Sequence, residues 1–189
     1  MIDLHTIDGF LDPETLAALA AELRAAAATQ STTLDGAVRS TVRSSKRVEV
    51  SPETRAGVKE RLMSRKGELE QHFGVELGEC EDPQFLRYQE GDFFVPHQDG
   101  NTPMLHDDSR FRRVSAVIFV TPRGEEPAPG TYGGGELVFH GHWTTEPTLR
   151  IPARAEPGTL VAFRSETTHE VTPVTHGERY TVVTWFRTA

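Results

Sequence analysis

The chain changes its hydrophobic period once, near residue 82, and this change limits the folds open to it. In the first 80 residues apolar side chains recur at spacings of three and four, which is typical of amphipathic helices. Beyond residue 82, short apolar runs are separated by Gly and Pro turns rather than by helical segments. This pattern does not fit alternating βαβ units. The sequence therefore predicts a closed barrel or sandwich of short strands, supported by helices.

Two helix starts stand in the amino-terminal part. Asp12-Pro13-Glu14 and Ser51-Pro52-Glu53 each place a capping side chain before a proline and an acid that faces the positive end of the helix dipole. We expect one helix after residue 12 and another from residue 52 to a stop at Gly74, with a loop over 31–45 and a short strand at 47–50. The expected buried stripes are Leu16, Leu19 and Leu23 in the first helix and Val58, Leu62, Leu69 and Phe73 in the second.

The carboxyl-terminal part contains seven short strand patterns between turns. They cover residues 84–88, 93–97, 114–120, 136–139, 159–164, 170–174 and 180–187. Two weakly patterned intervals, 101–113 and 122–133, are long for a compact domain, and we expect lids over a functional site there. The length of 189 residues suits one domain, with helical support and a connecting segment over 1–80 and the core over 83–187.

Composition narrows the classes of partner. The chain has 20 basic and 28 acidic residues and a formal charge of -8, so we expect neither a nucleic acid nor an anionic membrane to bind it. Cys80 is the only cysteine, which excludes an internal disulfide or a multi-thiolate zinc site and leaves histidines and carboxylates for any metal. Because no signal-peptide pattern or long apolar run is present, a cytoplasmic location is expected. Nothing in the pattern predicts an oligomeric state.

A histidine and a carboxylate stand two residues apart in His97-Gln98-Asp99. Residues i and i+2 of a strand point to the same face, so both side chains reach one ion. With His169, at the start of a later strand, they match the 2-His-1-carboxylate set of non-haem iron, which leaves positions open for a co-substrate and dioxygen. For the pair taken alone, a surface His and Asp near a turn is the alternative interpretation.

Arg179 opens the last strand pattern, whose odd-numbered residues share one face. If that face lines the barrel, the guanidinium is buried and requires an anion. Its planar fork suits a carboxylate. The anion is either an internal Asp or Glu or, beside an open iron site, a dicarboxylate co-substrate, which is the interpretation we favour.

These residues stand in a longer pattern that resembles a known family. The quoted positions are Tyr88-x-x-Gly91-x-x-x-x-x-His97-x-Asp99, Gly133-Gly134-Gly135-Glu136-Leu137-x-Phe139, Pro157-Gly158-x-Leu160-x-x-Phe163-x-Ser165-x-x-x-His169-x-Val171-x-x-Val174-x-x-Gly177-x-Arg179, and Trp185. Over residues 83–187 the chain resembles the Fe(II)/2-oxoglutarate-dependent dioxygenases of the prolyl 4-hydroxylase catalytic-domain type. The resemblance implies a mainly β fold with supporting helices, in which a double-stranded β-helix (jelly roll) packs against the N-terminal helices.

Carried over residue by residue, the resemblance assigns roles to the site. It implies that His97, Asp99 and His169 bind iron and that Arg179 holds the distal carboxylate of 2-oxoglutarate. Tyr88 corresponds to the family tyrosine that faces the iron pocket. The remaining walls of the co-substrate pocket would be Leu137, Val171, Val183 and Trp185, each of which is equally consistent with barrel core.

Two positions refine what the resemblance implies. Many relatives have a tyrosine near the end of the third predicted strand, where this chain has Phe119, so Arg179 needs help from Thr181, Ser115 or water. The carboxylate Asp99, in place of Gly or Ala, favours hydroxylation over halogenation, because a halogenating iron needs that ligand position for chloride.

The activity that the resemblance implies is oxidative decarboxylation of 2-oxoglutarate to succinate and carbon dioxide, coupled through dioxygen to hydroxylation of an unactivated C–H bond, with ascorbate as a candidate reductant. The favoured substrate is a prolyl or other amino-acid side chain, free or in a peptide. Alternatives are a small metabolite and a non-catalytic metal-binding jelly-roll module, which has no need of a buried Arg179. A third alternative is demethylating repair of nucleic acid. The net acidity and the 8% aromatic content argue against it.

Overall fold

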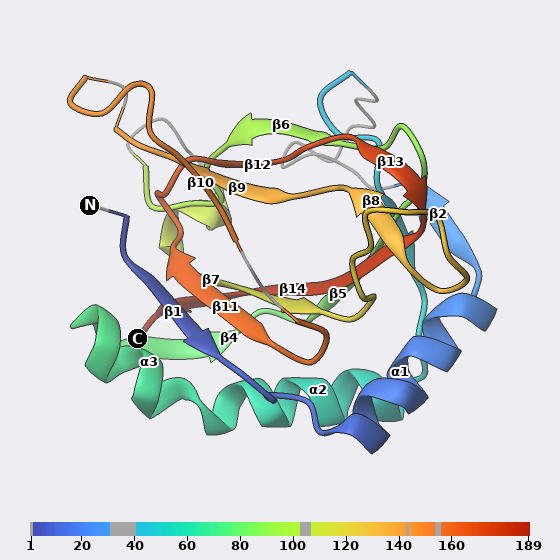
Figure 1. Cartoon of the computed structure of the whole chain (residues 1–189). Helices are drawn as coiled ribbons and strands as arrows, with labels where there is room; N and C mark the ends of the chain where they lie inside the picture. The colour runs from blue at the N-terminus through green and yellow to red at the C-terminus, as the bar shows by residue number, and fades with distance from the viewer. Residues whose placement is uncertain (1, 31–40, 103–106, 143, 154–155) are drawn as a thin grey trace.

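The computed structural model describes residues 2–30, 41–102, 107–142, 144–153 and 156–189. Its β-strands form a large sheet and an opposite layer of two smaller sheets, of which the four-stranded one is called the small sheet below. The helices cover the outer face of the large sheet (Figure 1). This arrangement gives the large sheet two buried faces, one against the helices and one against the interior between the sheets.

The large sheet has eight strands in the order β1-β11-β7-β14-β5-β3-β2, with β4 also paired to β14. The pairings between its strands are antiparallel. The strands are β1 (Leu4–Ile7), β2 (Ala28–Gln30), β3 (Lys46–Val48), β4 (Leu77–Cys80), β5 (Gln84–Tyr88), β7 (Arg112–Phe119), β11 (Leu160–Arg164) and β14 (Arg179–Thr188).

A four-stranded sheet with the order β10-β9-β12-β6 and a two-stranded sheet of β13 and β8 form the opposite layer. These strands are β6 (Phe94–His97), β8 (Tyr132–Gly134), β9 (Leu137–His140), β10 (Arg150–Pro152), β12 (His169–Val171) and β13 (Val174–Gly177). From β5 to β14 the chain passes back and forth between the two layers. The winding is that of a double-stranded β-helix, so the predicted fold class is confirmed.

Three helices support the large sheet: α1 (Pro13–Ala25), α2 (Pro52–Ser64) and α3 (Lys66–Phe73). Both predicted helix starts are confirmed, since the side chains of Asp12 and Ser51 accept hydrogen bonds from backbone N–H groups at 2.9 and 3.2 Å. The single helix predicted over 52–73 was wrong. Its path breaks at Arg65, whose N–H bonds to the carbonyl three residues back at 3.0 Å, and this tighter turn separates α2 from α3.

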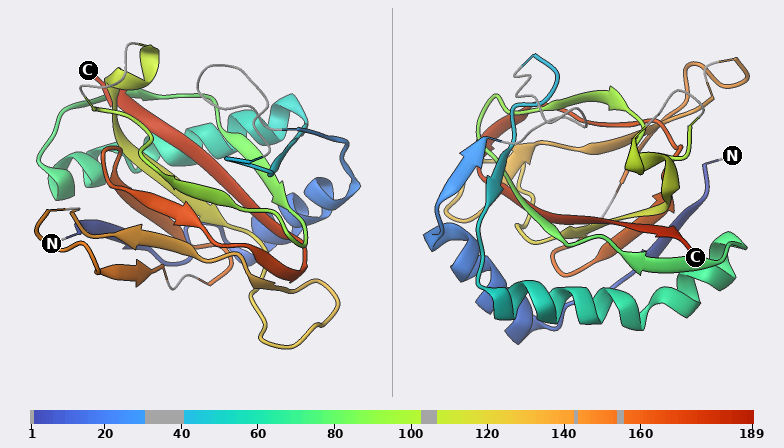
Figure 2. Two further views of the ribbon diagram at one scale, coloured as in Figure 1. Left: turned by 90° about the horizontal axis from the view of Figure 1, so that it is seen from above. Right: turned by 180° about the vertical axis from the view of Figure 1, so that it is seen from behind.

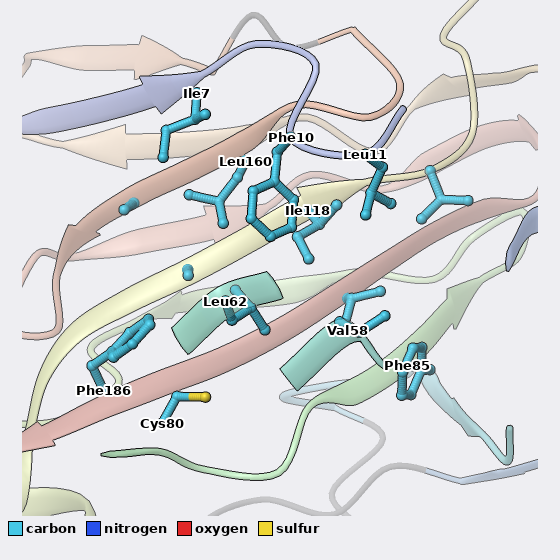
Figure 3. Packing of buried hydrophobic residues seen from close by; sticks show 14 of the residues in the cluster. Ile7, Phe10, Leu11, Val58, Leu62, Cys80, Phe85, Ile118, Leu160 and Phe186 are labelled. Carbon is cyan, nitrogen blue, oxygen red and sulfur yellow. The ribbon is translucent and has the colours of Figure 1, made fainter. Parts of the chain in front are cut away.

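The main hydrophobic core lies between the helices and the large sheet. Figure 3 shows side chains from both layers meeting there, among them Leu62 from α2, Ile118 from β7 and Phe186 from β14. Along β14 the even-numbered Tyr180, Val182 and Phe186 belong to this core. The odd-numbered side chains therefore face the interior between the sheets, as the alternation predicted.

Most predicted strands are confirmed in place, but three parts of the pattern were wrong or missed. The strand predicted over 170–174 is divided into β12 and β13 at Thr172 and Pro173, because proline has no N–H to continue the ladder. The short strands β1, β2, β4, β8 and β10 were not predicted, since three or four residues show no clear alternation and these strands form by pairing with other strands. A 3-10 helix, Asp108–Phe111, lies in the interval 101–113. Most of the predicted loop 31–45 lies outside the described residues.

Candidate active site

A cavity of about 660 Å³ lies between the two sheets. The large sheet contributes side chains of β5, β7 and β14, and the small sheet contributes side chains of β6, β9 and β12. All three residues of the predicted metal set line it, together with Arg179. The cavity thus brings the predicted metal ligands and the predicted carboxylate-binding group into one space.

The predicted metal ligands converge because β6 and β12 are neighbours in the small sheet. In this antiparallel pair His97 and His169 stand directly opposite each other. Asp99 follows β6, and its N–H donates to the Ser165 carbonyl at 2.9 Å. The ligand atoms of the three side chains all lie within 4.8 Å of one another, and the Asp99 carboxylate oxygens are 3.6 Å and 3.5 Å from the Nε2 atoms of His97 and His169.

Both imidazoles are oriented by the backbone. The Nδ1 of His97 bonds to the carbonyl oxygen of Val95 at 2.8 Å, and the Nδ1 of His169 bonds to that of Thr167 at 2.9 Å. Because a carbonyl only accepts, each Nδ1 carries the proton and each Nε2 presents a lone pair to the centre. Aromatic rings hold the imidazoles in place: Phe94 stacks on His97 at 3.5 Å between centroids, and Phe163 meets His169 edge-on at 4.7 Å.

The protonation states of the centre suit a divalent cation. Burial raises the pKa of the Asp99 carboxyl, but the electrostatic influence of the two adjacent imidazoles outweighs burial and holds that pKa well below its usual range. Burial is the main cause that lowers the pKa of His169 to about 4, so this imidazole is neutral near pH 7. A carboxylate and neutral imidazoles are the donors that non-haem Fe(II) takes from a 2-His-1-carboxylate set, so the residues present fit this metal.

Arg179 is buried in the cavity wall, with only 2% of its surface exposed. Its Nη1 donates to the Thr181 hydroxyl at 3.3 Å, and its Nε is buried with no hydrogen-bond partner in the described part of the chain. The guanidinium carbon lies 5.1 Å from the ring centre of Tyr88 and 5.5 Å from that of Phe119. No ion pair joins Arg179 to any carboxylate of the described residues, so the alternative of an internal Asp or Glu partner finds no support there. A buried guanidinium of this kind fits the distal carboxylate of 2-oxoglutarate.

Gly135 makes room for this arginine. Its φ of +55° is in the left-handed region, and a Cβ atom there would lie 3.0 Å from Cδ of Arg179 and 2.9 Å from Cγ2 of Val174. The third glycine of the Gly133–Gly135 run in the sequence thus allows β14 to approach the small sheet closely. A side chain at this position would press on Arg179, the arginine expected to bind the carboxylate.

The other predicted pocket residues also line the cavity: Tyr88, Leu137, Val171, Thr181, Val183 and Trp185. Tyr88 on β5 stands directly opposite Arg179 on β14. Of the two polar side chains expected to help Arg179, Thr181 contacts it, whereas the Ser115 hydroxyl bonds to that of Ser165 at 3.1 Å. Their roles toward a ligand remain predictions.

Arg112 has a place that the sequence did not predict. Although it belongs to the weakly patterned interval 101–113, it is only 8% exposed. Its Nε and Nη2 donate to the two carboxylate oxygens of Glu81 at 2.8 and 2.7 Å, and its Nη1 donates to the backbone oxygen of Asp99 at 3.1 Å. The guanidinium carbon lies 3.7 Å from the ring centre of Trp185. Alternation along β7 gives no signal for this position, since the pairing of β7 with β14 is irregular next to Phe186.

Two further arginines that sequence analysis did not single out, Arg43 and Arg47, line the cavity as well. The two expected lids differ in their relation to the cavity. In the interval 101–113, residues 103–106 lie outside the described residues, and Asp107 and Arg112 line the cavity. The interval 122–133 is described in full and none of its residues lines the cavity. Closure of either interval stays a prediction.

The fold and the site together define a class: a double-stranded β-helix that carries a 2-His-1-carboxylate set beside a buried arginine is a non-haem iron oxygenase scaffold. The particular family follows from the sequence. Residues 83–187 match the model of the 2OG-Fe(II) oxygenase superfamily, and the chain belongs to this family. The expected cofactors, Fe(II) and 2-oxoglutarate, are confirmed at the level of the family.

Relatives and solved structures agree with this assignment. A PKHD-type hydroxylase of Hyphomonas neptunium is 30% identical over 188 residues, which are 97% of this chain and 77% of the relative. Another, from Paracoccus denitrificans, is 35% identical over 105 residues, so that this chain spans 41% of its length. A prolyl-4-hydroxylase of Pseudomonas putida has a similar structure, with a TM-score of 0.74 and 25% identity over 100% of this chain and 94% of that one. The fold is also that of a viral collagen prolyl hydroxylase from Paramecium bursaria Chlorella virus-1, with a TM-score of 0.68 and 22% identity over 99% of this chain and 97% of that one.

None of the helices in the described residues has both the length and the apolar character needed to span a bilayer. The expected cytoplasmic location and the expected lack of nucleic-acid and membrane partners remain predictions.

Proposed function

We propose that this protein is an Fe(II)- and 2-oxoglutarate-dependent hydroxylase that acts on an unactivated C–H bond of a prolyl or other amino-acid side chain, free or within a peptide. One observation carries the proposal. The three metal-ligating side chains, whose ligand atoms lie within 4.8 Å of one another, share a cavity with a buried arginine that has no carboxylate partner among the described residues. A metal-only module has no use for such an arginine, so a co-substrate with a carboxylate explains the pair of features better.

Relatives support the choice of substrate class. The curated relatives described above are named PKHD-type hydroxylases, and the similar structure from Pseudomonas putida is a prolyl-4-hydroxylase. Amino-acid and peptidyl side chains are therefore the first substrates to test. A small metabolite is the other candidate within the same chemistry.

Each group of residues has a separate task in this proposal. His97, Asp99 and His169 bind Fe(II) through Nε2 and carboxylate atoms. Arg179 binds the distal carboxylate of 2-oxoglutarate, and Thr181 holds the guanidinium in position. When bound, Fe(II) and 2-oxoglutarate supply the oxidation, in which dioxygen converts the keto acid to succinate and carbon dioxide and one oxygen atom enters the substrate. Apolar walls from Leu137 and Val171 exclude water from the reacting atoms.

The proposal is tested by a screen of amino acids, proline-containing peptides and small metabolites for stimulated succinate formation. The Fe(II)-loaded protein should release succinate slowly by itself and faster with its substrate, and the product should gain one oxygen atom by mass spectrometry. His169→Ala removes one metal ligand and is the matched control, in which both rates should disappear. Absence of succinate from the wild-type protein, with or without candidates, would favour the non-catalytic metal-binding module.

A further inference from the structure

The chain segment before α2 closes one side of the cavity. Its first part pairs with the small sheet: the Val42 carbonyl accepts from the N–H of Val95 at 3.0 Å, and the Ser44 N–H donates to the Phe93 carbonyl at 3.1 Å. Its second part, β3, pairs with β5 of the large sheet. Seen from behind, this teal segment passes from the side of the small sheet down to the helices (Figure 2, right). Residues 42–48 thus form a wall that joins the two sheets.

Arg47 points from this wall into the cavity. The next residue, Val48, is buried in the core against the helices, so strand alternation directs Arg47 to the opposite face, and Arg47 does line the cavity. Across the sheet Arg47 stands opposite Leu86, which in turn stands opposite Thr181. With about 4.8 Å between neighbouring strands, the backbone of Arg47 lies roughly 10 Å from that of Thr181, the residue that contacts Arg179.

Arg43 enters the same cavity close to the metal ligands. Its guanidinium carbon lies 4.9 Å from the ring centre of Phe94, and that ring lies 3.5 Å from the imidazole centre of His97. The guanidinium therefore lies no farther from the His97 ring than the sum of these distances. The Nε of Arg43 donates to the Ser45 hydroxyl at 2.8 Å, which fixes the side chain in the wall.

The charges around this wall favour an anion. Burial lowers the pKa of Arg47, and the positive charge of Arg43 lowers it further, while Glu49 acts in the opposite direction. Among the described residues, the carboxylates that line the cavity are Asp99, which lies between the two histidines, and Asp107, which accepts from the backbone N–H of Ser109 at 2.9 Å. Two guanidiniums in one wall of an acidic protein thus form a local positive site.

We propose that Arg43 and Arg47 form a second anion-binding site in the cavity, separate from Arg179, which binds a carboxylate of the substrate. The proposal rests on the proposed function and narrows its substrate class to molecules that carry a carboxylate near the hydroxylated carbon. Arg179 binds the co-substrate in this proposal. Arg43 reaches the neighbourhood of the metal ligands from the wall segment, where its guanidinium lies beside the Phe94 ring. Guanidinium groups suit this task because their planar N–H pairs match a carboxylate.

Two matched pairs of probes test the proposal by succinate formation above the rate without substrate. The first pair is a pool of short end-blocked peptides with Pro and Asp or Glu, and the same pool with Asn and Gln in their place. The second pair is a mixture of free amino acids and the mixture of their amides. In one of the pairs the carboxylate member should be roughly 10-fold more stimulating, which corresponds to about 1.4 kcal/mol. The pair that responds shows whether the carboxylate is a side chain or the free amino acid's own.

The variants Arg47→Gln and Arg47→Lys, with Arg43→Gln as a second position, connect the preference to the wall. In the Gln variants, the ratio of stimulation by the carboxylate probe to stimulation by its amide counterpart should fall toward one. Arg47→Lys should retain part of the preference because the charge remains. The matched control is Arg61→Gln on α2, where the arginine pairs with Asp12 at the surface. Each variant is first checked for a wild-type melting curve.

Equal stimulation by the two members of each pair would overturn the proposal, and so would a preference that survives in both Gln variants. Stimulation by none of the probes, while the wild-type protein still releases succinate slowly, also counts against it. If the Fe(II)-loaded wild-type protein releases no succinate at all, that result contradicts the proposed function instead. The two failures are therefore distinguishable.

Discussion

At the scale of single residues, the site depends on polar atoms that the protein has already oriented. Each metal-binding histidine uses its Nδ1 on the carbonyl two residues earlier in the chain, which leaves Nε2 for the ion. Arg179 has the opposite character, because its Nε is buried and has no hydrogen-bond partner among the described residues. We expect the first arrangement to orient the predicted ligands before a metal binds, and the second to make a bound co-substrate part of the hydrogen bonding in the cavity.

The change Arg179→Lys keeps the positive charge and removes the planar fork. We expect it to weaken 2-oxoglutarate binding by about 1–3 kcal/mol, measured by calorimetry on the Mn(II)-loaded protein. Metal affinity without the keto acid should not change and serves as the internal control. Equal 2-oxoglutarate affinity in the variant and the wild type would mean that another group binds the distal carboxylate.

We expect Glu81 and Arg112 to position Asp99, the predicted carboxylate ligand of the metal. Glu81 holds Arg112 through two hydrogen bonds, and Arg112 contacts both the Asp99 backbone oxygen and the Trp185 ring. We expect Glu81→Gln, which removes the charge but keeps the size, to lower Mn(II) affinity by roughly 10-fold. Metal titration followed by electron paramagnetic resonance measures this. A change in melting temperature with unchanged metal affinity would limit the pair to a structural role.

At the scale of elements, β14 connects the two functions of the large sheet. Its even-numbered side chains pack against the helices, and its odd-numbered side chains, from Arg179 to Trp185, line the cavity. The helices thus stabilise the strand from its outer face, while its inner face carries the polar groups of the site. Helix ends that hold the helical layer in place should therefore affect stability rather than ligand binding.

The start of α1 is expected to make stability depend on acid pH. Hydrogen bonds from the backbone and hydroxyl of Thr15, together with Arg61, lower the pKa of Asp12 from 3.8 to about 2. Because the pKa is lower in the folded state, the contribution of the carboxylate is complete above about pH 4 and is lost as the pH falls toward 2. Asp12→Asn keeps a capping oxygen without a titration. Denaturant unfolding should show the stability advantage of wild type over Asp12→Asn shrinking over this range, and a constant difference would contradict the assignment.

At the scale of the whole molecule, the cavity joins the two sheets through the ligands it is expected to hold. The small sheet provides His97 and His169, and the large sheet provides Arg179. A metal and a keto acid bound together would connect the layers. Binding to the native state alone stabilises a protein by mass action, so ligands should stabilise this fold as a whole.

We expect Mn(II) with 2-oxoglutarate, each at about 100 times its dissociation constant, to stabilise the wild-type protein by roughly 5.4 kcal/mol, about 2.7 kcal/mol from each ligand, and to raise its melting temperature by roughly 10–20 °C. The matched control is His169→Ala, which should fold but show little of this shift. Differential scanning fluorimetry measures both. The same rise in the variant would place metal and keto acid elsewhere on the protein.

Local patterns in the sequence determined much of this protein. The caps at Asp12 and Ser51 start helices because a side chain satisfies N–H groups of its own first turn. The odd-numbered face of β14 follows from the two-residue period of a strand. His97 and Asp99 also reach one centre as their spacing predicted, although Asp99 lies just beyond the end of β6. The helix break at Arg65 and the strand break at Pro173 depend on turn geometry, which hydrophobic periodicity does not show.

Tertiary structure alone decided which distant residues meet. His169 reaches His97 because β12 pairs with β6, and no local rule sets that register. Arg112 turns toward Asp99 where the pairing of β7 and β14 is irregular, and Arg43 and Arg47 face the cavity because one segment pairs with both sheets. The physical reason is that pairing between remote strands is selected by the burial of both sheet faces at once, a property of the closed structure rather than of any one segment.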